Sequence, residues 1–283
     1  MFVDSHCHLS LPELYDRVPK IRHDMAAAGV DRALCICTTL EEFPTVHALA
    51  TAHDNFWCTV GVHPDNEGVT EPSLDDLLIR AALPRVVGIG ETGLDYYRVG
   101  ERTDAQMEWQ RERFRIHIRA ARRTGLPLVI HTRSASADTL LILADEGQGE
   151  VRGVFHCFTE TMAVAEAALA LGFHISFSGI LTFKNAADLR EVAMAVPIER
   201  CLIETDSPYL APVPKRGKTN EPAFVPFVAA KLAELKGLDL QAVAQATSRN
   251  FECLFGLPPI AASAQPTVRA TAQTTSPATL EHT

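Results

Sequence analysis

The sequence predicts a single (β/α)₈ TIM barrel, and three observations support this fold class. Short apolar β-like runs alternate with helix-like segments, which is the pattern of a parallel sheet buried on both faces. Potential metal ligands follow several of these runs, as expected where strand ends converge at one mouth of a barrel. The length of 283 residues suits a barrel, which typically takes about 250 residues as one domain.

The eight predicted strands share a high content of aliphatic and aromatic residues. In order they are Phe2 to His8, Arg32 to Thr38, Phe56 to His63, Val86 to Glu91, Leu128 to His131, Gly153 to His156, His174 to Ser178 and Cys201 to Thr205. The helices predicted between and after them are Val18 to Ala28, Thr45 to Ala52, Leu74 to Ala81, Ala105 to Arg123, Ala137 to Asp145, Met162 to Leu171, Ala186 to Val196 and Val225 to Leu235.

A last helix is predicted over Leu240 to Leu254, and Gly256-Leu257-Pro258-Pro259 ends it. We therefore predict one barrel domain over residues 1–260. From Ala261 onward the chain is rich in Ala, Thr, Ser and Pro and has no aromatic residue, so residues 261–283 are expected to form a disordered tail.

An open, doubly wound sheet is the competing fold. It would gather its ligands at one crevice near a switch point, whereas the candidate ligands here come from the first, fourth, fifth, sixth and eighth strands. A closed barrel lets all these strand ends converge, so the ligand positions favour the barrel.

Composition describes an ordinary globular enzyme, with 47% hydrophobic and 22% charged residues. The net charge of -9 argues against broad electrostatic wrapping of nucleic acid, although a local basic loop can still bind one phosphate end. An odd count of seven cysteines, no CxxC pair and no signal-peptide pattern favour a cytoplasmic protein. No apolar stretch reaches membrane-spanning length, and five cysteines in apolar runs are predicted to be buried thiols, namely Cys35, Cys37, Cys58, Cys157 and Cys201.

The first candidate metal ligands lie in the first predicted strand. There His6 and His8 occupy alternate positions and so point to one face. Two imidazoles beside Asp4 would be costly to bury without a metal or another partner. Four further candidate ligands follow apolar runs, namely Glu91, His131, His156 and Asp206. Imidazole and carboxylate ligands suit zinc, manganese and related ions, and a carboxylate can bridge two of them. The set predicts a binuclear site, whose usual chemistry includes phosphoester hydrolysis.

Some of these residues have a structural alternative. Glu91 follows small residues and could instead cap a helix at a strand end, and Asp206 could cap the helix after the last strand. A carboxylate in the position of Asp206 can also accept a proton from bound water, with Glu204 as the second choice for that general base. His117 and His174 each lie alone beside an apolar run and are interpreted as structural histidines.

Six motifs carry a resemblance to a known family. They are Asp4-Ser5-His6-Cys7-His8, Gly61-Val62-His63-Pro64, Gly90-Glu91-Thr92-Gly93-Leu94-Asp95-Tyr96-Tyr97, Ile130-His131-Thr132-Arg133, Phe155-His156-Cys157-Phe158 and Glu204-Thr205-Asp206-Ser207-Pro208-Tyr209-Leu210. In this order, over residues 1 to 258, the chain resembles the TatD-type metal-dependent deoxyribonucleases. The resemblance implies an amidohydrolase-type barrel with 3′ to 5′ exonuclease action on DNA.

The resemblance also implies roles for individual residues. His6, His8, Glu91 and Asp206 would hold one metal, and Glu91, His131 and His156 the second, with Glu91 as the bridge. Asp206 would activate the water. His63 and Arg133 resemble substrate-phosphate contacts, and the imidazole of His63 has a further metal or a leaving group as alternative partners.

Other residues near the predicted mouth bear on the substrate. The loop Lys215-Arg216-Gly217-Lys218 follows the last strand, and Arg216 can bind phosphate oxygens bidentately there. Tyr96 and Tyr97 can stack on a terminal base or pack in the core. Two departures from the family pattern, Leu9-Ser10 and Thr159-Glu160, affect the pocket rim, where the Glu160 carboxylate would repel an anion.

The sequence thus predicts a cytoplasmic, monomeric phosphodiesterase that trims DNA 3′ ends and binds two divalent ions per chain, with zinc, manganese, magnesium and nickel all compatible. One alternative is hydrolysis of another bond at the same site, such as an amide, a lactone or the ester of an aminoacylated RNA. Another is a non-catalytic module that holds metal or nucleic acid.

Overall fold

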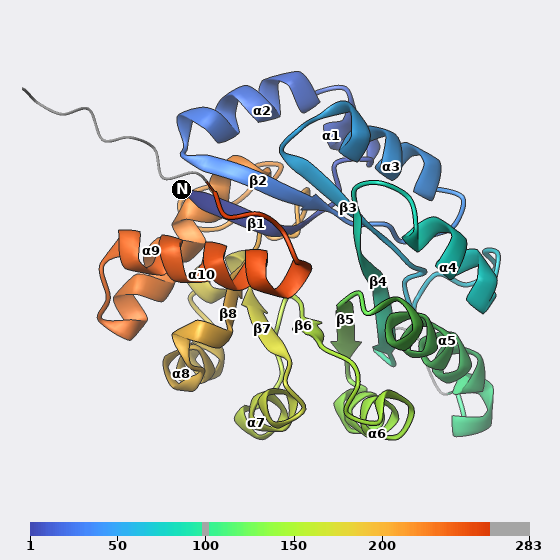
Figure 1. Cartoon of the computed structure of the whole chain (residues 1–283). Helices are drawn as coiled ribbons and strands as arrows, with labels where there is room; N and C mark the ends of the chain where they lie inside the picture. The colour runs from blue at the N-terminus through green and yellow to red at the C-terminus, as the bar shows by residue number, and fades with distance from the viewer. Residues whose placement is uncertain (98–101, 261–283) are drawn as a thin grey trace, which may run out of the picture.

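Eight parallel strands form the centre of the computed structural model, which describes residues 1–97 and 102–260. The predicted tail, 261–283, lies outside the described residues. Each strand pairs with the next in chain order, as Figure 1 shows. The strands are β1 (Phe2–Cys7), β2 (Val30–Cys35), β3 (Phe56–Val60), β4 (Val86–Asp95), β5 (Leu128–Arg133), β6 (Gly153–Phe155), β7 (His174–Phe177) and β8 (Cys201–Ile203).

The barrel closes where the ends of β1 and β8 meet. Cys7 and Ser207 form a parallel bridge. The His8 amide donates to the Ser207 carbonyl at 2.9 Å, and the Asp206 amide donates to the His6 carbonyl at 2.9 Å. The nearly closed eight-stranded barrel confirms the predicted fold class.

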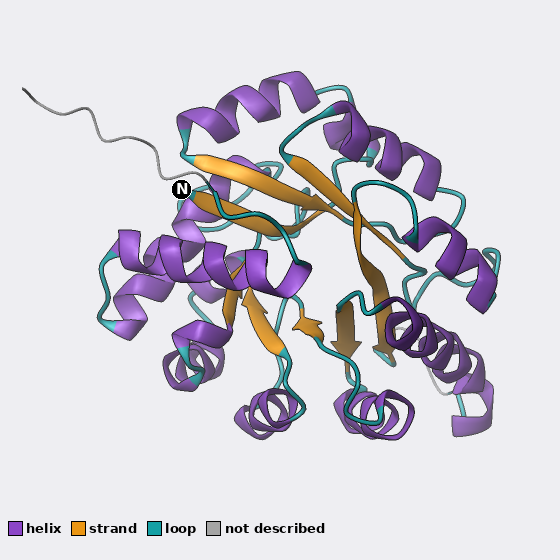
Figure 2. Ribbon diagram, in the orientation of Figure 1, coloured by secondary structure: helices purple, strands orange, loops and turns teal. Residues whose placement is uncertain are grey.

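Helices surround the strands on the outside, as Figure 2 shows. They are α1 (Pro12–Tyr15), α2 (Val18–Ala27), α3 (Phe43–Ala52), α4 (Leu74–Ala81), α5 (Glu108–Thr124), α6 (Ser136–Gly147), α7 (Met162–Ala170), α8 (Ala187–Ala195), α9 (Val225–Lys236) and α10 (Leu240–Phe255). Local signals explain several ends: Ser73 and Asp76 form a capping box at the start of α4, and Gly125 ends α5 in the left-handed conformation.

β4 extends four residues beyond its predicted end at Glu91, because it continues to pair with β5 as far as Asp95 opposite Arg133. Glycines permit this close pairing. A Cβ on Gly93, where φ is +132°, would lie 2.0 Å from the His131 carbonyl oxygen. Glu91 therefore sits within a strand, and its interpretation as a helix cap is wrong.

The interior of the barrel is apolar at one end and polar at the other. Inward-facing residues such as Val129, Val154 and Leu202 pack against Phe251 and Phe255 of α10, which lies across that end of the barrel (Figure 1). Because side chains alternate along a strand, the next inward positions point toward the opposite mouth. His131, His156 and Glu204 occupy those positions, two residues further along.

The cysteines mostly follow the prediction. Four of the five thiols predicted as buried are buried, whereas Cys157 is partly exposed, because it lies at the mouth just after β6. Among residues 1–97 and 102–260, no helix has both the length and the apolar character needed to cross a membrane.

Candidate metal centre

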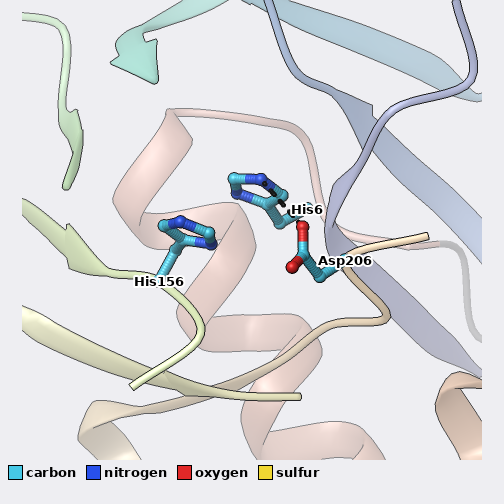
Figure 3. A group of neighbouring side chains, drawn as sticks. All are labelled: His6, His156 and Asp206. Carbon is cyan, nitrogen blue, oxygen red and sulfur yellow. Dashed lines mark ion pairs between the residues drawn. The ribbon is translucent and has the colours of Figure 1, made fainter. Parts of the chain in front are cut away.

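Four side chains, from β1, the residue directly after β1, β4 and the segment after β8, converge at the carboxyl-terminal mouth of the barrel. The Nε2 atoms of His6 and His8 lie 3.2 Å apart. Glu91 Oε2 is 3.3 Å from His6 Nε2 and 3.9 Å from His8 Nε2. Asp206 Oδ1 is 3.2 Å from His8 Nε2 and 3.6 Å from His6 Nε2. Figure 3 shows His6 and Asp206 pointing toward one another beside His156.

These spacings match a ligand set. Metal–ligand distances of about 2.0–2.1 Å in a tetrahedral zinc site place the ligand atoms roughly 3.3 Å from one another. Two imidazole nitrogens that face each other with their lone pairs need a shared cation or a proton between them. His6, His8 and Glu91 form one group whose ligand atoms all lie within 4.8 Å of one another.

The other oxygen of Glu91 faces a second group of imidazoles. Glu91 Oε1 lies 2.8 Å from His156 Nε2, 3.3 Å from His131 Nδ1 and 3.3 Å from His63 Nε2. The structure thus brings His63, expected at the substrate phosphate, into direct contact with Glu91. The ring of His156 also stacks on His6 with centroids 3.8 Å apart, and Figure 3 shows the two rings beside each other, so His156 contacts both groups.

Each imidazole of the second group has a carboxylate at its other nitrogen. Asp65 Oδ1 lies 2.7 Å from His63 Nδ1, Asp95 Oδ2 lies 3.0 Å from His131 Nε2, and Glu204 Oε1 lies 3.2 Å from His156 Nδ1. Carboxylates in this position fix the tautomer and ring orientation of metal-binding histidines. Asp65 and Asp95 were not among the residues predicted from the sequence, although Asp95 lies within one of the quoted motifs and Asp65 directly follows another.

Buried polar atoms test whether these residues fit a metal. Within the described part of the chain, His156 Nε2 is buried and has no hydrogen-bond partner. The His156 nitrogen lies close to Glu91 without forming a hydrogen bond. A buried nitrogen with a free lone pair is costly, and a divalent ion would satisfy it. The donor set therefore fits the metal that the sequence predicts.

The charges of the site explain the pKa shifts of its carboxylates. Burial alone would raise the pKa of Glu91, but the imidazoles of His156, His63 and His6 outweigh it and hold this pKa well below its usual value. Burial opposes the shift at Asp206 as well, yet a hydrogen bond from His8 and the nearby histidines lower its pKa. Both carboxylates are therefore ionised at neutral pH.

The pKa values of the site histidines shift in opposite directions. Burial and the charge of His156 lower the pKa of His6. At His156 burial opposes the change, but Glu91 and Glu204 raise its pKa well above 6.5. Burial also acts to lower the pKa of His63, but Glu91 and Asp65 outweigh it and raise this pKa to about 9. Two stacked imidazoles cannot both carry a proton cheaply, which is why the charge of His156 acts to lower the pKa of His6.

Sharp turns after the strands aim the site residues. Cys157 and Asp206 have φ angles of 42° and 56°, a conformation that non-glycine residues rarely adopt. Asp4 accepts hydrogen bonds from the amides of His6 and Thr205 and so ties β1 to the segment after β8. The Asn220 side chain holds this segment further by donating to the Thr205 carbonyl at 2.8 Å. No helix directly follows Asp206, so its alternative interpretation as a helix cap is wrong.

Arginine side chains near the mouth stack on aromatic rings. The Arg133 guanidinium lies 3.7 Å from the ring centre of Tyr97, and that of Arg216 lies 3.9 Å from the ring centre of Phe183. Tyr97 is largely exposed. Tyr96 instead packs against the core and donates from its hydroxyl to Asp138 at 2.8 Å, so of the two rings Tyr97, which Arg133 covers on one side, is the exposed one.

Three further residues considered in the sequence lie outside the cluster of candidate ligands, namely Glu160, His174 and His117. Burial raises the pKa of the half-buried Glu160 carboxyl, whereas a hydrogen bond with Ser136 and the charge of His131 act against this shift. His174 and His117 are buried, and both nitrogens of His117 are hydrogen-bonded within the protein. Their interpretation as structural histidines agrees with these positions.

Comparison with known proteins identifies the family. The family model described as TatD related DNase matches residues 3–256. The chain belongs to this family. It is therefore a metal-dependent hydrolase, and the family resemblance seen in its motifs is confirmed.

Several relatives in this family have known sequences or structures. An uncharacterized metal-dependent hydrolase, YcfH of Escherichia coli (strain K12), is 46% identical over 257 residues, covering 89% of this chain and 95% of that protein. A 3′-5′ ssDNA/RNA exonuclease, TatD of Escherichia fergusonii, is 34% identical over 237 residues, covering 82% and 90%. The crystal structure of YJJV, a TatD homologue from Escherichia coli K12, superposes with a TM-score of 0.83 at 29% identity, covering 91% and 98%.

Proposed function

We propose that this chain is a divalent-metal-dependent phosphodiester hydrolase that removes nucleotides from the 3′ end of DNA. The observation that carries the proposal is the position of Glu91, whose two oxygens face two separate groups of imidazoles. A carboxylate placed in this way can bridge two ions, and paired ions are a common solution for displacement at phosphorus. The relative named as a 3′-5′ ssDNA/RNA exonuclease supports the choice of substrate.

The proposed ligands follow the two sides of Glu91. His6, His8, Glu91 and Asp206 would hold one ion, and Glu91, His131 and His156 the other. Ions bound there would lower the pKa of a water molecule and neutralise charge on the phosphate. Zinc, manganese, magnesium and nickel all remain compatible with these ligands.

The protein's own groups would then move the protons. Water attacks phosphorus and the bond from phosphorus to the 3′ oxygen breaks, which releases a nucleoside 5′-monophosphate. The ionised Asp206 carboxylate would accept the proton of the water. His63, held between Asp65 and Glu91, would supply a proton to the leaving oxygen. Glu204 is fully buried behind His156 and so suits an orienting role better than that of the base.

Arg133 and Arg216 at the mouth of the barrel would bind the DNA substrate. Stacking on Tyr97 and Phe183 fixes the planes of Arg133 and Arg216 and leaves N–H groups at their edges for phosphate oxygens. The exposed Tyr97 ring offers a face for the terminal base. These contacts would let an acidic protein bind a nucleic acid end locally.

The test uses metal-stripped protein and single-stranded DNA labelled at its 3′ end. Addition of magnesium, manganese or zinc should release labelled mononucleotide, and Asp206→Asn should abolish release. Asp145→Asn, which removes an exposed carboxylate far along α6, is the matched control and should retain activity. Circular single-stranded DNA should resist the enzyme because it offers no end.

Other outcomes would redirect the proposal. Cleavage of the circular substrate would replace the exonuclease with an endonuclease. Failure to release nucleotide with any metal, from protein shown to bind metal, would refute the DNA assignment and favour an amide, lactone or aminoacyl-ester substrate. Cytoplasmic location and a monomeric state stay predictions, for which fractionation and sedimentation are the measurements.

A further inference from the structure

We propose that two side chains of α5, Arg113 and His117, are positioning residues that hold the segment after β3, and with it His63, against Glu91. The proposal rests on the proposed function in one respect, since it takes His63 as part of the reacting centre. Neither α5 residue touches the candidate ligands with its side chain. Both act on the backbone that carries His63.

Arg113 joins two points of that segment. Its side chain is only 1% exposed. Nη1 donates to the His63 carbonyl at 2.7 Å, Nε donates to Glu71 Oε2 at 2.8 Å, and Nη2 donates to Glu71 Oε1. The guanidinium also lies over the Trp109 ring. A guanidinium is costly to bury unless its donors are satisfied. Here residues 63 and 71 of one loop satisfy them.

His117 holds the same segment one helical turn further along α5. It is fully buried, and Nδ1 donates to the Arg113 carbonyl at 2.8 Å. The proton on Nδ1 leaves Nε2 as an acceptor, and Nε2 receives the Val62 amide at 3.0 Å. Burial lowers the pKa of His117 to about 4, which keeps the ring neutral as this pair of bonds requires.

The need for such support follows from where β3 ends. The strand stops at Val60, so Val62 and His63 lie beyond its regular pairing. Residues four apart on a helix share a face, which lets Arg113 and His117 reach adjacent residues of the loop. His63 Nε2 must stay 3.3 Å from Glu91 Oε1, and a shift of the loop of about 1 Å would disturb that contact.

A pair of substitutions at His117 separates positioning from general packing. A glutamine amide oxygen falls near the place of Nε2 and can accept the Val62 amide, whereas an asparagine amide reaches only the place of Nδ1. With a 3′-labelled DNA oligonucleotide, whose 3′ alkoxide leaving group needs a proton, and manganese as probes, we expect His117→Asn and Arg113→Met to lower kcat about 10- to 100-fold, with KM changed less than about twofold. His117→Gln should keep kcat within about threefold of wild type. Arg119→Met, on the same helix, is the control, since Arg119 pairs with Glu112 and Glu146.

A double variant tests whether Arg113 acts through His63. In a His63→Ala background, Arg113→Met should lower kcat by less than about twofold further, because the residue it positions is already absent. Multiplied losses would overturn the proposal, as would equal losses in His117→Gln and His117→Asn. If Arg113→Met fails to fold, the two His117 variants decide the matter.

A measurement without catalysis separates this proposal from the proposed function. Long-range ¹H–¹⁵N spectra report the ring nitrogens of His63 directly in metal-free protein. We expect these signals to shift in His117→Asn and to stay near wild type in His117→Gln and Arg119→Met. Unchanged His63 signals in His117→Asn would refute positioning, even if the wild-type enzyme hydrolyses no phosphodiester.

Discussion

Asp95→Asn should weaken metal binding by reversing a tautomer. Asp95 Oδ2 accepts from His131 Nε2 at 3.0 Å, which leaves His131 Nδ1 free to face Glu91. Asp95 Oδ1 also receives the Tyr97 amide at 2.9 Å. An asparagine keeps the Tyr97 bond and turns its NH₂ group toward His131. Nε2 must then accept, and the proton moves to Nδ1, where a metal would bind.

The expected loss of metal affinity follows from the single hydrogen bond between Asp95 and His131. The Asp95 side chain is 3% exposed, so its bond with His131 is little weakened by water. Removing such a partner of a metal-binding histidine costs about 10- to 100-fold in affinity, or roughly 1.4–2.8 kcal/mol. This range agrees with about 1.5–3 kcal/mol for a hydrogen bond to a charged group.

Calorimetric titration of metal-stripped protein with zinc or manganese measures the effect. In Asp95→Asn, one of the metal sites should bind metal more weakly. The melting temperature of the metal-free protein should change little. Asp138→Asn removes a carboxylate that binds Tyr96 and Arg111 instead of a histidine, and it should leave affinity unchanged. Equal affinities in wild type and Asp95→Asn would refute the reasoning.

Three further predictions concern stability. The pKa of His63 is raised from 6.5 to about 9, so the stability from its pairing is complete below pH 6.5 and is lost as pH rises through about 9. In metal-free protein, the melting difference between wild type and His63→Gln should shrink over that range, and a constant difference would contradict the pairing. Metal at 100 times its Kd should stabilise wild type by about 2.7 kcal/mol per site. Glu91→Gln should lose most of this gain in thermal melts, and full retention would argue against Glu91 as a ligand. Gly93→Ala places a methyl group 2.0 Å from the His131 carbonyl and should destabilise the fold by about 1–3 kcal/mol, more than Gly125→Ala, where the added methyl meets open space. Equal costs in denaturant titrations would refute that clash.

The sequence alone was sufficient for the fold class and for the main candidate residues. Alternation of strand-like and helix-like segments is a local property, so it can be read without knowledge of contacts. His6 and His8 share a strand face by spacing alone, and Glu91, His131 and His156 follow apolar runs that became strands. The structure brings all of these residues to one mouth of the barrel.

The tertiary structure decided how those residues meet. The pairing of Asp95 with His131 joins residues 36 positions apart, and that of Glu204 with His156 joins residues 48 apart. The extension of β4 to Asp95 and the hydrogen bond from Arg113 to the His63 carbonyl likewise depend on neighbouring elements. Periodicity fixes which way a side chain points within its own strand. Register, barrel closure and helix packing fix what lies opposite, and these arise only when distant segments come together.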